Sequence, residues 1–400
     1  MNPEKYIYLD NNATCCVSPE VEEAMVPFFQ QFYGNPSSMH SFGGQVFRHI
    51  EEARRKVAAL LNADPEEIVF TSCGTESDNH AIRGVFQAFP EKRHFITTKV
   101  EHPAVLMVAD FLEKKGYQVT KIKVDKFGNL DLDEFRDSIT SNTGLVSVMA
   151  ANNETGTLFP IEEIGLICRE KGIYFHTDAV QAAGKIPLDV KKIPVDLLSI
   201  SGHKVHAPKG IGVLYIRRGV KLDPFILGGH QERSRRAGTE NVPYIIGLGK
   251  ACELALAGIL EENSRVRELR DKLETGIVKK IPFTRINGNP KWRLPNTCNI
   301  GFELIEGESI LLHMDKAKIA ASSGSACTSG SLEPSHVLLA MDVPFSYVHG
   351  SVRFSLSRYN TEEEINYVLQ VLPGIIEKLR EISPFYTKEY KEKAQNWNLA

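Results

Sequence analysis

The stretch from residue 67 to residue 216 alternates short apolar runs with segments of helical periodicity. Apolar runs predict seven strands, at 67–71, 94–98, 118–124, 143–150, 174–177, 197–201 and 212–216, and helical spacing between them predicts helices at 76–89, 104–115, 132–139 and 161–171. Most of these runs are apolar throughout rather than alternating, which is typical of strands buried on both faces. We therefore predict an α/β domain built on a mostly parallel sheet, in which ligands bind beyond the carboxyl ends of the strands.

The flanking segments predict further elements. A strand at 6–9, a polar turn and helices at 19–33 and 44–61 come first; a long helix at 242–279 with a break near 261, strands at 297–302 and 352–355, helices at 310–314 and 361–382, and a polar tail come last. A chain of 400 residues exceeds what one core usually holds, so two domains are expected. The predicted division is a large domain at 17–258, with residues 1–16 as an arm that joins a small α+β domain at 259–400.

Composition narrows the classes of protein. With 42% hydrophobic and 24% charged residues and a net charge of -3, the chain fits a soluble globular protein without a nucleic-acid or membrane partner. We see neither an apolar signal core at the N-terminus nor a membrane-spanning run, so a cytoplasmic location is expected. The 7 cysteines are odd in number and form no CxxC pair, which argues against a disulfide framework and a zinc site. Each cysteine is therefore either a packing residue or a reactive one.

Two motifs place polar side chains just past predicted strands. FHTDAVQ does so for Asp178 and Gln181, and LLSISGHK does so for Lys204. Asp178 is either a helix N-cap or a carboxylate that pairs with a protonated ring nitrogen, as pyridoxal phosphate (PLP) requires. A loop lysine is ordinarily a solvated charge, but a desolvated lysine at a strand end can form a Schiff base. Ser201 and His203 beside it are candidate phosphate ligands.

Three more segments carry candidate chemistry. TSCGTES leads from a strand into a helix, whose N-terminal N–H groups can bind an anion beside Gly74; alone this signal is weak, and Cys73 is interpreted as a packing residue. Cys327 stands among small polar residues that predict an exposed, mobile loop, whereas the other six cysteines are expected to pack. Arg353 interrupts an apolar strand, so it either forms a structural salt bridge or binds a substrate carboxylate.

Together these motifs resemble the cysteine desulfurases of the NifS/IscS branch, which are fold-type I PLP-dependent transferases with a large domain and a smaller α+β domain. The resemblance runs through YLDNNAT, EHPAV, ANNETGT, HTDAVQ, SGHK, RAGTEN, SSGSACTSGSLEPSHVL and VRFSLSR, which together span nearly the whole chain. None of these pieces is specific by itself, but SGHK combined with SSGSACTSG is.

The resemblance implies PLP as the cofactor and assigns its contacts. Lys204 is implied to form a Schiff base with it, Asp178 to pair with the ring nitrogen, and Gln181 to hydrogen-bond the ring hydroxyl. His102 is implied to stack over the ring and shuttle a proton, although its position alone indicates a helix-start residue. Asn153 is implied to lie beside cofactor and substrate. The implied phosphate ligands are Gly74, Thr75, Ser201 and His203.

The resemblance also implies the substrate and the partners. Arg353, together with Asn153, is implied to bind the carboxylate of L-cysteine. Cys327 is implied to attack its sulfur, so that alanine leaves and Cys327 carries a persulfide for an iron–sulfur scaffold protein, NifU-like or IscU-like. Where a cluster is transferred, Cys327 is also the candidate metal ligand. Thr239 is implied to reach the phosphate of a neighbouring subunit, which makes the protein a homodimer.

Details of the sequence narrow the branch. The long cysteine loop resembles the long-loop group rather than the SufS-like group with its shorter cysteine segment. Its Gly-Ser after ACTS and His336 favour the NifS type, which supplies nitrogenase metalloclusters, over the IscS type, a general donor for iron–sulfur clusters and tRNA thiolation. The chain departs from the family where NNATCC replaces NNATT, so that Cys15 stands for a threonine. We interpret Cys15 as a packing residue, with a second sulfur-accepting thiol as the alternative.

Two other functions stay open at this point. One is a different PLP reaction, such as that of an aminotransferase or a selenocysteine lyase; an aminotransferase has no use for the thiol of Cys327. The other is a sulfur carrier or scaffold that keeps the fold without catalysis. The intact set of Lys204, Asp178 and His102 argues against it.

Overall fold

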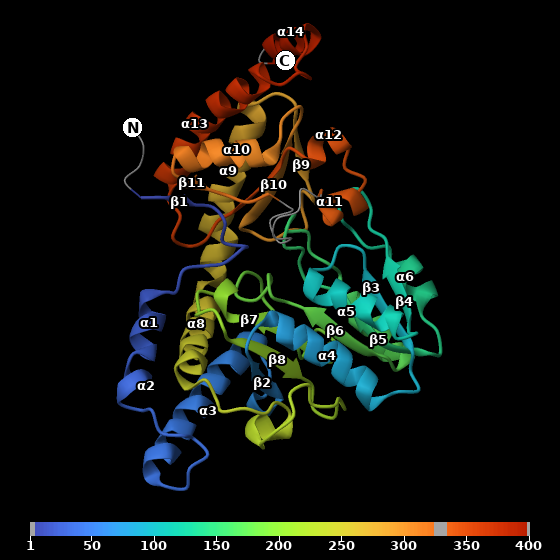
Figure 1. The fold of residues 1–400 in the computed structure, drawn as a ribbon, viewed down its shortest axis with the longest axis vertical. Coiled ribbons are helices and arrows are strands. Elements are labelled where there is room, and N and C mark those ends of the chain that lie inside the picture. Colours follow the sequence, from blue (N-terminus) through green and yellow to red (C-terminus); the bar gives the residue numbers. More distant parts are fainter. Residues whose placement is uncertain (1–4, 324–333, 398–400) are drawn as a thin grey trace.

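The computed structural model describes residues 5–323 and 334–397, and its central element is a seven-stranded sheet (Figure 1). The strand order is β2-β8-β7-β6-β5-β3-β4. The strands are β2 (Ile68–Thr71), β3 (His94–Thr98), β4 (Gln118–Ile122), β5 (Thr143–Ser147), β6 (Tyr174–Asp178), β7 (Leu197–Ser201) and β8 (Gly212–Ile216). Strands β3 to β7 are parallel, whereas β8 is antiparallel to β2 and β7. The predicted α/β fold with a mostly parallel sheet is confirmed.

Helices cover both faces of this sheet. They are α1 (Pro19–Met25), α2 (Pro27–Gln30), α3 (Ser41–Leu61), α4 (Gly74–Ala88), α5 (Pro103–Lys114), α6 (Leu132–Ser138), α7 (Ile161–Lys171) and α8 (Val242–Glu261). Val69 and Phe95 pack with α4 and α5, whereas the next residues, Phe70 and Ile96, join the core of α3, α7 and α8. Consecutive strand residues point to opposite faces. The strands are therefore buried on both sides, as their uninterrupted apolar runs predict.

The C-terminal part is built on a second, antiparallel sheet in the order β12-β10-β9. Its elements are α9 (Arg267–Lys280), β9 (Thr284–Asn287), β10 (Thr297–Phe302), α10 (Gly307–Lys316), α11 (His336–Ala340), α12 (Phe345–Val348), β12 (Ser351–Ser355), α13 (Glu362–Glu381) and α14 (Lys388–Trp397). The N-terminal strand β1 (Ile7–Tyr8) pairs with β11 (Ile319–Ala320), and Ile7 and Leu9 join the core of α9 and α13. The division at 17–258 and 259–400 stays a prediction.

Helix α8 continues through one π-helical turn, Glu262–Val266, into α9, where the sequence predicts a break. By length and composition, the joined run Val242–Lys280 is the one helix of the described residues that could cross a membrane, whereas no such run is expected from the sequence. Of its apolar window, 44% is buried inside the molecule, and α8 packs against α1 and α3. These apolar residues therefore contribute to the core of the chain.

Three regions differ from the expectation. The helix expected at 19–33 is two helices, α1 and α2, because Pro27 lacks the N–H group that would continue the first one. The polar tail at the end of the chain is helical as α14. Within it, Lys393 Nζ lies 2.7 Å from Glu389 Oε1, one turn away. Strand β9 was not predicted, because its sequence TRIN is short and largely polar.

Candidate active site

A pocket lies where the carboxyl ends of β5, β6 and β7 meet the N-terminus of α4. About 490 Å³ of space lies within and in front of it, open solvent included. Eight of the predicted site residues line it: Gly74, Thr75, His102, Asn153, Asp178, Gln181, Ser201 and His203. They come from distant parts of the sequence, and the sheet brings them together because the ends of parallel strands share one edge.

One part of the pocket is suited to an anion. Gly74 is the first residue of α4, so N–H groups of the helix N-terminus are free to bind a negative charge there. A side chain at this position would collide, since its Cβ would lie 2.8 Å from Val180 Cγ2. His203 Nδ1 lies 3.1 Å from Thr14 Oγ1. Burial, with the charge of Lys204, lowers the pKa of His203 to about 4, so the ring is neutral at pH 7.

A second part of the pocket presents an acid and an amide. Asp178, 6% exposed, accepts a hydrogen bond from Val180 N at 2.9 Å. Burial raises the pKa of Asp178 to about 6, against the opposing effects of the Val180 N–H group and the Lys204 charge. Gln181 Nε2 donates to Asn12 O at 3.0 Å, while its buried Oε1 has no hydrogen-bond partner within the described part of the chain. An acid and an unpartnered amide oxygen fit a ring nitrogen and a ring hydroxyl.

Lys204 ends the short 3₁₀ turn Gly202–Lys204 that follows β7. Its Nζ donates to the carbonyl oxygens of Asn12 and Ala13, the latter at 2.7 Å. Gln181 donates to the same Asn12 carbonyl, so the N-terminal arm holds the amine beside this wall of the pocket. A lysine amine, an acid, an amide and an anion-binding helix end are together the donor set that PLP requires. The residues present therefore fit PLP.

His102 starts α5, as its position alone indicates, and it also lies in the pocket wall, while its stacking over the ring stays a prediction. It is the N-cap of α5, where its Nδ1 accepts a hydrogen bond from Ala104 N at 3.1 Å, and it lines the pocket. Burial first, and then the charges of Lys204 and His336, lower the pKa of His102 to about 4. The ring is therefore neutral at pH 7. Because Nδ1 is an acceptor, we assign the ring hydrogen to Nε2.

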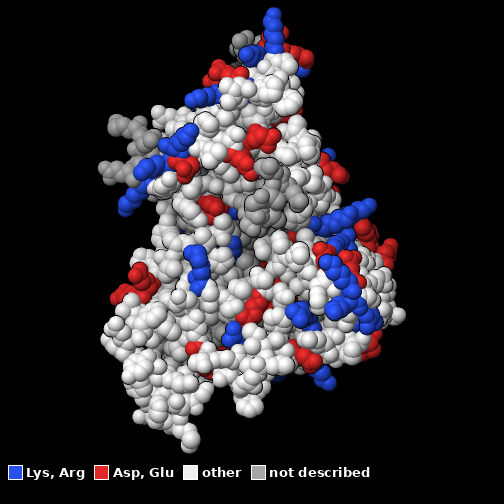
Figure 2. All heavy atoms as spheres, viewed as in Figure 1, with Lys and Arg blue, Asp and Glu red and all other residues white. Residues whose placement is uncertain are grey.

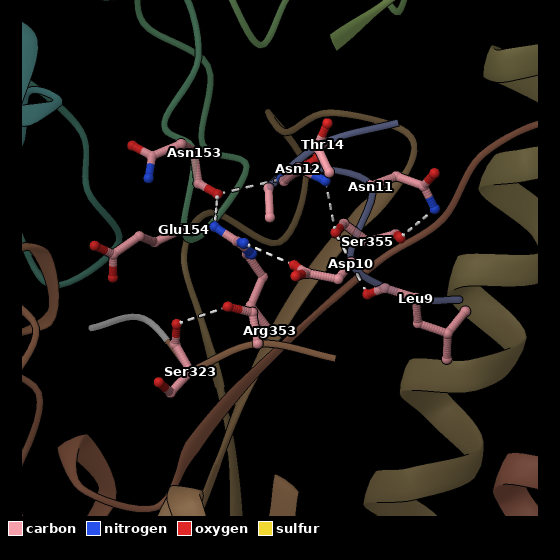
Figure 3. Close-up of polar contacts among 12 residues, drawn as sticks. Leu9, Asp10, Asn11, Asn12, Thr14, Asn153, Glu154, Ser323, Arg353 and Ser355 are labelled. Atoms are coloured by element: carbon pink, nitrogen blue, oxygen red, sulfur yellow. Dashed lines mark hydrogen bonds and ion pairs between the residues drawn. The ribbon is translucent and has the colours of Figure 1, made fainter. Parts of the chain in front are cut away.

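Arg353 connects the N-terminal arm to the pocket (Figure 3). Its Nη2 donates to Asp10 Oδ1 at 2.9 Å, and its Nη1 donates to Asn153 O at 3.0 Å. The side chain is 1% exposed, and Nε has no hydrogen-bond partner in residues 5–323 and 334–397. The salt bridge of the structural interpretation is present. The guanidinium also contacts a residue of the pocket wall, so a substrate carboxylate there would lie within its reach; that role stays a prediction.

Lys204 and Arg353 lie beside the pocket without lining it, and two further predicted site residues, Thr239 and Cys327, are not placed there by the structure. Thr239 is exposed and does not line the pocket of its own chain; its implied contact is with a second subunit and stays a prediction. The segment that carries it is held by Arg236, whose Nε lies 2.9 Å from Glu76 Oε1. Cys327 lies outside the described residues, and with it the predicted persulfide and cluster ligand. Within the described ranges, no group of three or more His, Cys, Asp or Glu side chains could hold a metal ion.

Cys15 lies close to Lys204 but is poorly suited to accept sulfur. Its side chain is 3% exposed, and Sγ lies 3.3 Å from Asn11 O and 3.6 Å from Lys204 O. Burial raises the pKa of this thiol. Since the thiolate is the nucleophilic form, the structure favours the interpretation of Cys15 as a packing residue.

Sequence reasoning missed some residues of the pocket wall. Cys73, expected only to pack, lines the pocket and caps α4, where its Sγ accepts a hydrogen bond from Glu76 N at 3.4 Å. Asp78 also lines the pocket. It stands four residues after Gly74 in the same helix, and this spacing on one helix face was a signal that could have found it.

Known proteins resemble this chain over most of its length. Residues 7–368 match the aminotransferase class-V family. A cysteine desulfurase of Trichormus azollae is 61% identical over 96% of this chain and 96% of its own, and the cysteine desulfurase NifS of Azotobacter vinelandii is 57% identical over 95% of each. The cysteine desulfurase IscS of Methanosarcina thermophila is 54% identical over 97% of this chain and 96% of its own. A solved NifS-like protein superposes with a TM-score of 0.88 at 41% identity, covering 94% of this chain and 100% of the other.

Proposed function

This chain belongs to the cysteine desulfurases of the aminotransferase class-V family, and from this premise we infer that it takes sulfur from free L-cysteine, releases L-alanine and supplies iron–sulfur cluster assembly. One observation carries the inference: a single pocket gathers Asp178, Gln181 and His102 beside the amine of Lys204. Bound PLP supplies an electron sink for bond breaking at the α-carbon of the substrate.

The residues of the chain divide the remaining work. Asp178 holds the positive charge of the ring nitrogen, and the Lys204 amine, once free, accepts the α-proton of the substrate. Arg353 binds the substrate carboxylate and so orients the α-carbon. The Cys327 thiolate then attacks the substrate sulfur: the new S–S bond forms, the C–S bond breaks with its electron pair on the β-carbon, the β-carbon takes a proton, and Lys204 returns the α-proton, so that alanine leaves. Cys327 is left as a persulfide.

The enzymatic reaction is tested by its products. Purified protein with bound PLP, given L-cysteine and a thiol reductant, is expected to form alanine and sulfide in equal amounts without any keto acid. A requirement for a keto acid would indicate an aminotransferase instead. Failure to bind PLP would indicate a sulfur carrier. A strong preference for L-selenocysteine over L-cysteine would indicate a selenocysteine lyase.

We propose that the sulfur serves nitrogenase metalloclusters, as in the NifS type, by way of a NifU-like scaffold. The Gly-Ser after ACTS and His336 support this proposal, and an IscS-type donor for general clusters and tRNA thiolation is the alternative. The measurement is persulfide transfer from this enzyme to purified NifU-like and IscU-like scaffolds, compared at equal concentration. Faster transfer to the IscU-like scaffold would reject the NifS assignment. Where a cluster is transferred, we propose Cys327 as its ligand.

We also propose that the protein is a cytoplasmic homodimer. Exposed apolar side chains gather on α2, the loop that follows it, α3 and the 226–240 segment; they include Phe29, Tyr33, Met39, Phe47 and Leu227. Figure 2 shows few charged side chains at the lower end of the molecule, where Figure 1 places α2 and α3. Thr239 belongs to the 226–240 segment. A second copy of this chain would cover these side chains and bring Thr239 to its pocket. Sedimentation at twice the chain mass of 44.6 kDa, and recovery in the soluble cell fraction, are the expected results.

Arg353→Lys is expected to raise the KM for L-cysteine by about 10- to 100-fold, with a smaller change in kcat. A lysine keeps the charge but cannot bind a carboxylate through two parallel hydrogen bonds, so it loses substrate binding first. Steady-state alanine formation measures both constants, and the matched control is Arg267→Lys at an exposed position of α9. An unchanged KM in a folded variant would leave Arg353 only its salt bridge with Asp10.

A further inference from the structure

Asp78 of α4 is a buried carboxyl group that the proposed reaction does not use. It is 1% exposed and lines the same pocket as Asp178. Its Oδ1 has no hydrogen-bond partner within the described residues, and the nearest ring nitrogen, His176 Nε2, lies 3.5 Å away. The hydroxyl of Ser199 lowers the pKa of this carboxyl group, against the effect of burial. A second acid thus lies beside the acid assigned to the cofactor.

The groups around Asp78 form a polar chain across three adjacent strands. His176 of β6 lies with its Nδ1 2.8 Å from Ser147 Oγ of β5 and its Nε2 2.9 Å from Ser199 Oγ of β7. The imidazole is fully buried, and burial lowers the pKa of His176 to about 3, so it carries no positive charge at pH 7. Near Asp78, strands β5, β6 and β7 therefore present the hydroxyl groups of Ser147 and Ser199 and the neutral ring of His176, none of which is a cation.

The ionisable groups that face Asp78 are acidic or neutral. They are Asp178 of β6, Glu101 before α5 and Cys73 at the start of α4, besides His176. Two carboxylates enclosed together in a low-dielectric pocket do not both ionise without a large cost. Burial, and then the charge of Asp178, raise the pKa of Asp78 well above its ordinary value.

The contacts of the two acids decide which one keeps the charge. Asp178 accepts a hydrogen bond from Val180 N at 2.9 Å, and the positive charge of Lys204 lowers its pKa. Within the described residues, the groups that the structure gives Asp78 are the Ser199 hydroxyl and the neutral imidazole of His176. A carboxylate is stabilised by N–H donors and cations, so the negative charge belongs on Asp178 and the proton on Asp78.

We propose that Asp78 is a positioning residue. It is a neutral acid that holds a proton beside Ser199 and His176, so that the negative charge of the two acids stays on Asp178, at the ring nitrogen of PLP. It acts through Asp178 and does not itself touch the cofactor ring. The proposal rests on the assignment of Asp178 to that nitrogen. Its test uses cofactor binding, so that it stands or falls separately from cysteine desulfuration.

The test compares three variants by the affinity of the apoprotein for PLP and by the pH midpoint of the visible absorbance of bound PLP. Asp78→Ala removes the supporting group and is expected to weaken PLP binding at least tenfold. Asp78→Asn keeps a neutral hydrogen-bonding group of the same shape, so it is expected to recover affinity to within about threefold and to leave the pH midpoint in place. Asp178→Asn, the same change on the other acid, is expected to weaken PLP binding at least tenfold.

Each deviation has a definite meaning. A shift of the pH midpoint by one unit or more in Asp78→Asn would place a negative charge on Asp78 and overturn the proposal. If Asp78→Ala binds PLP with wild-type affinity, Asp78 makes no contribution to cofactor binding. Wild-type affinity in Asp178→Asn would remove the premise about the ring nitrogen, while leaving the desulfurase reaction to be judged by its own products. If Asp78→Ala does not fold, the comparison of the two asparagine variants still decides where the charge lies.

Discussion

Replacing Lys204 by alanine is expected to lower the rate of alanine formation from L-cysteine by at least about a thousandfold. The amine donates to the Asn12 and Ala13 carbonyls beside the pocket wall. Without it, the covalent link to PLP and the acceptor for the α-proton are lost together. Asp178, Gln181 and the N-terminus of α4 remain, so PLP is still expected to bind non-covalently.

The measurement is single-turnover alanine formation at saturating L-cysteine, with the visible spectrum recorded alongside. Lys204→Arg is not expected to restore activity, because a guanidinium stays protonated and cannot accept the α-proton. Lys209→Ala, an exposed lysine in the same connection between β7 and β8, is the matched control and is expected to keep full activity. Activity within tenfold of wild type in Lys204→Ala would disprove the assignment of this lysine.

Replacing Cys327 by serine is expected to reduce sulfide release to below about 1% of wild type while PLP stays bound. A serine hydroxyl is not ionised near pH 7 and is a poor nucleophile toward sulfur, so the step that breaks the C–S bond has no acceptor. The residues that line the pocket are unchanged, so the absorbance of bound PLP is expected to be retained. Sulfide release with a reductant, together with mass spectrometry of the protein for the added sulfur atom, measures the loss.

Cys15→Ser is the matched control for this variant. Its thiol lies close to Lys204 but is buried with a raised pKa, so its loss is expected to leave both sulfide release and the added sulfur atom unchanged. Full activity in Cys327→Ser would show that sulfur leaves by another route, and a loss of activity in Cys15→Ser would revive the second-thiol interpretation. The two results are independent, because only one of the thiols is altered in each protein.

Strand ends were the most informative part of the sequence. Asp178, Ser201 and Lys204 follow apolar runs, and a run of that kind identifies both a buried strand and the edge at which its neighbours also end. The predicted pocket residues therefore met in one place. Boundaries such as those of β3 and β10 agree with the prediction because a turn or a polar residue stops each apolar run.

Other features were not visible in any local pattern. The ion pair of Arg353 with Asp10 joins residues more than three hundred positions apart, and both of its interpretations were open until the arm was placed. The shared pocket of Asp78 and Asp178 was another, because the spacing from Gly74 indicates the helix face of Asp78 but not which groups of other segments line the same pocket. The helix α14 was read as a tail, since its polar composition is equally typical of an unstructured end.

The sequence by itself determined the alternation of strands and helices, the two-sided burial of the sheet and the family, because each rests on short-range periodicity or on motifs of adjacent residues. The tertiary structure decided which carbonyls hold the Lys204 amine, which partner Arg353 takes and why Asp78 holds a proton. These depend on distances between segments that touch only after the arm, the large sheet and the C-terminal part have packed together. Burial then fixes the charge of each acid, since the cost of an ion depends on what surrounds it and not on its neighbours in sequence.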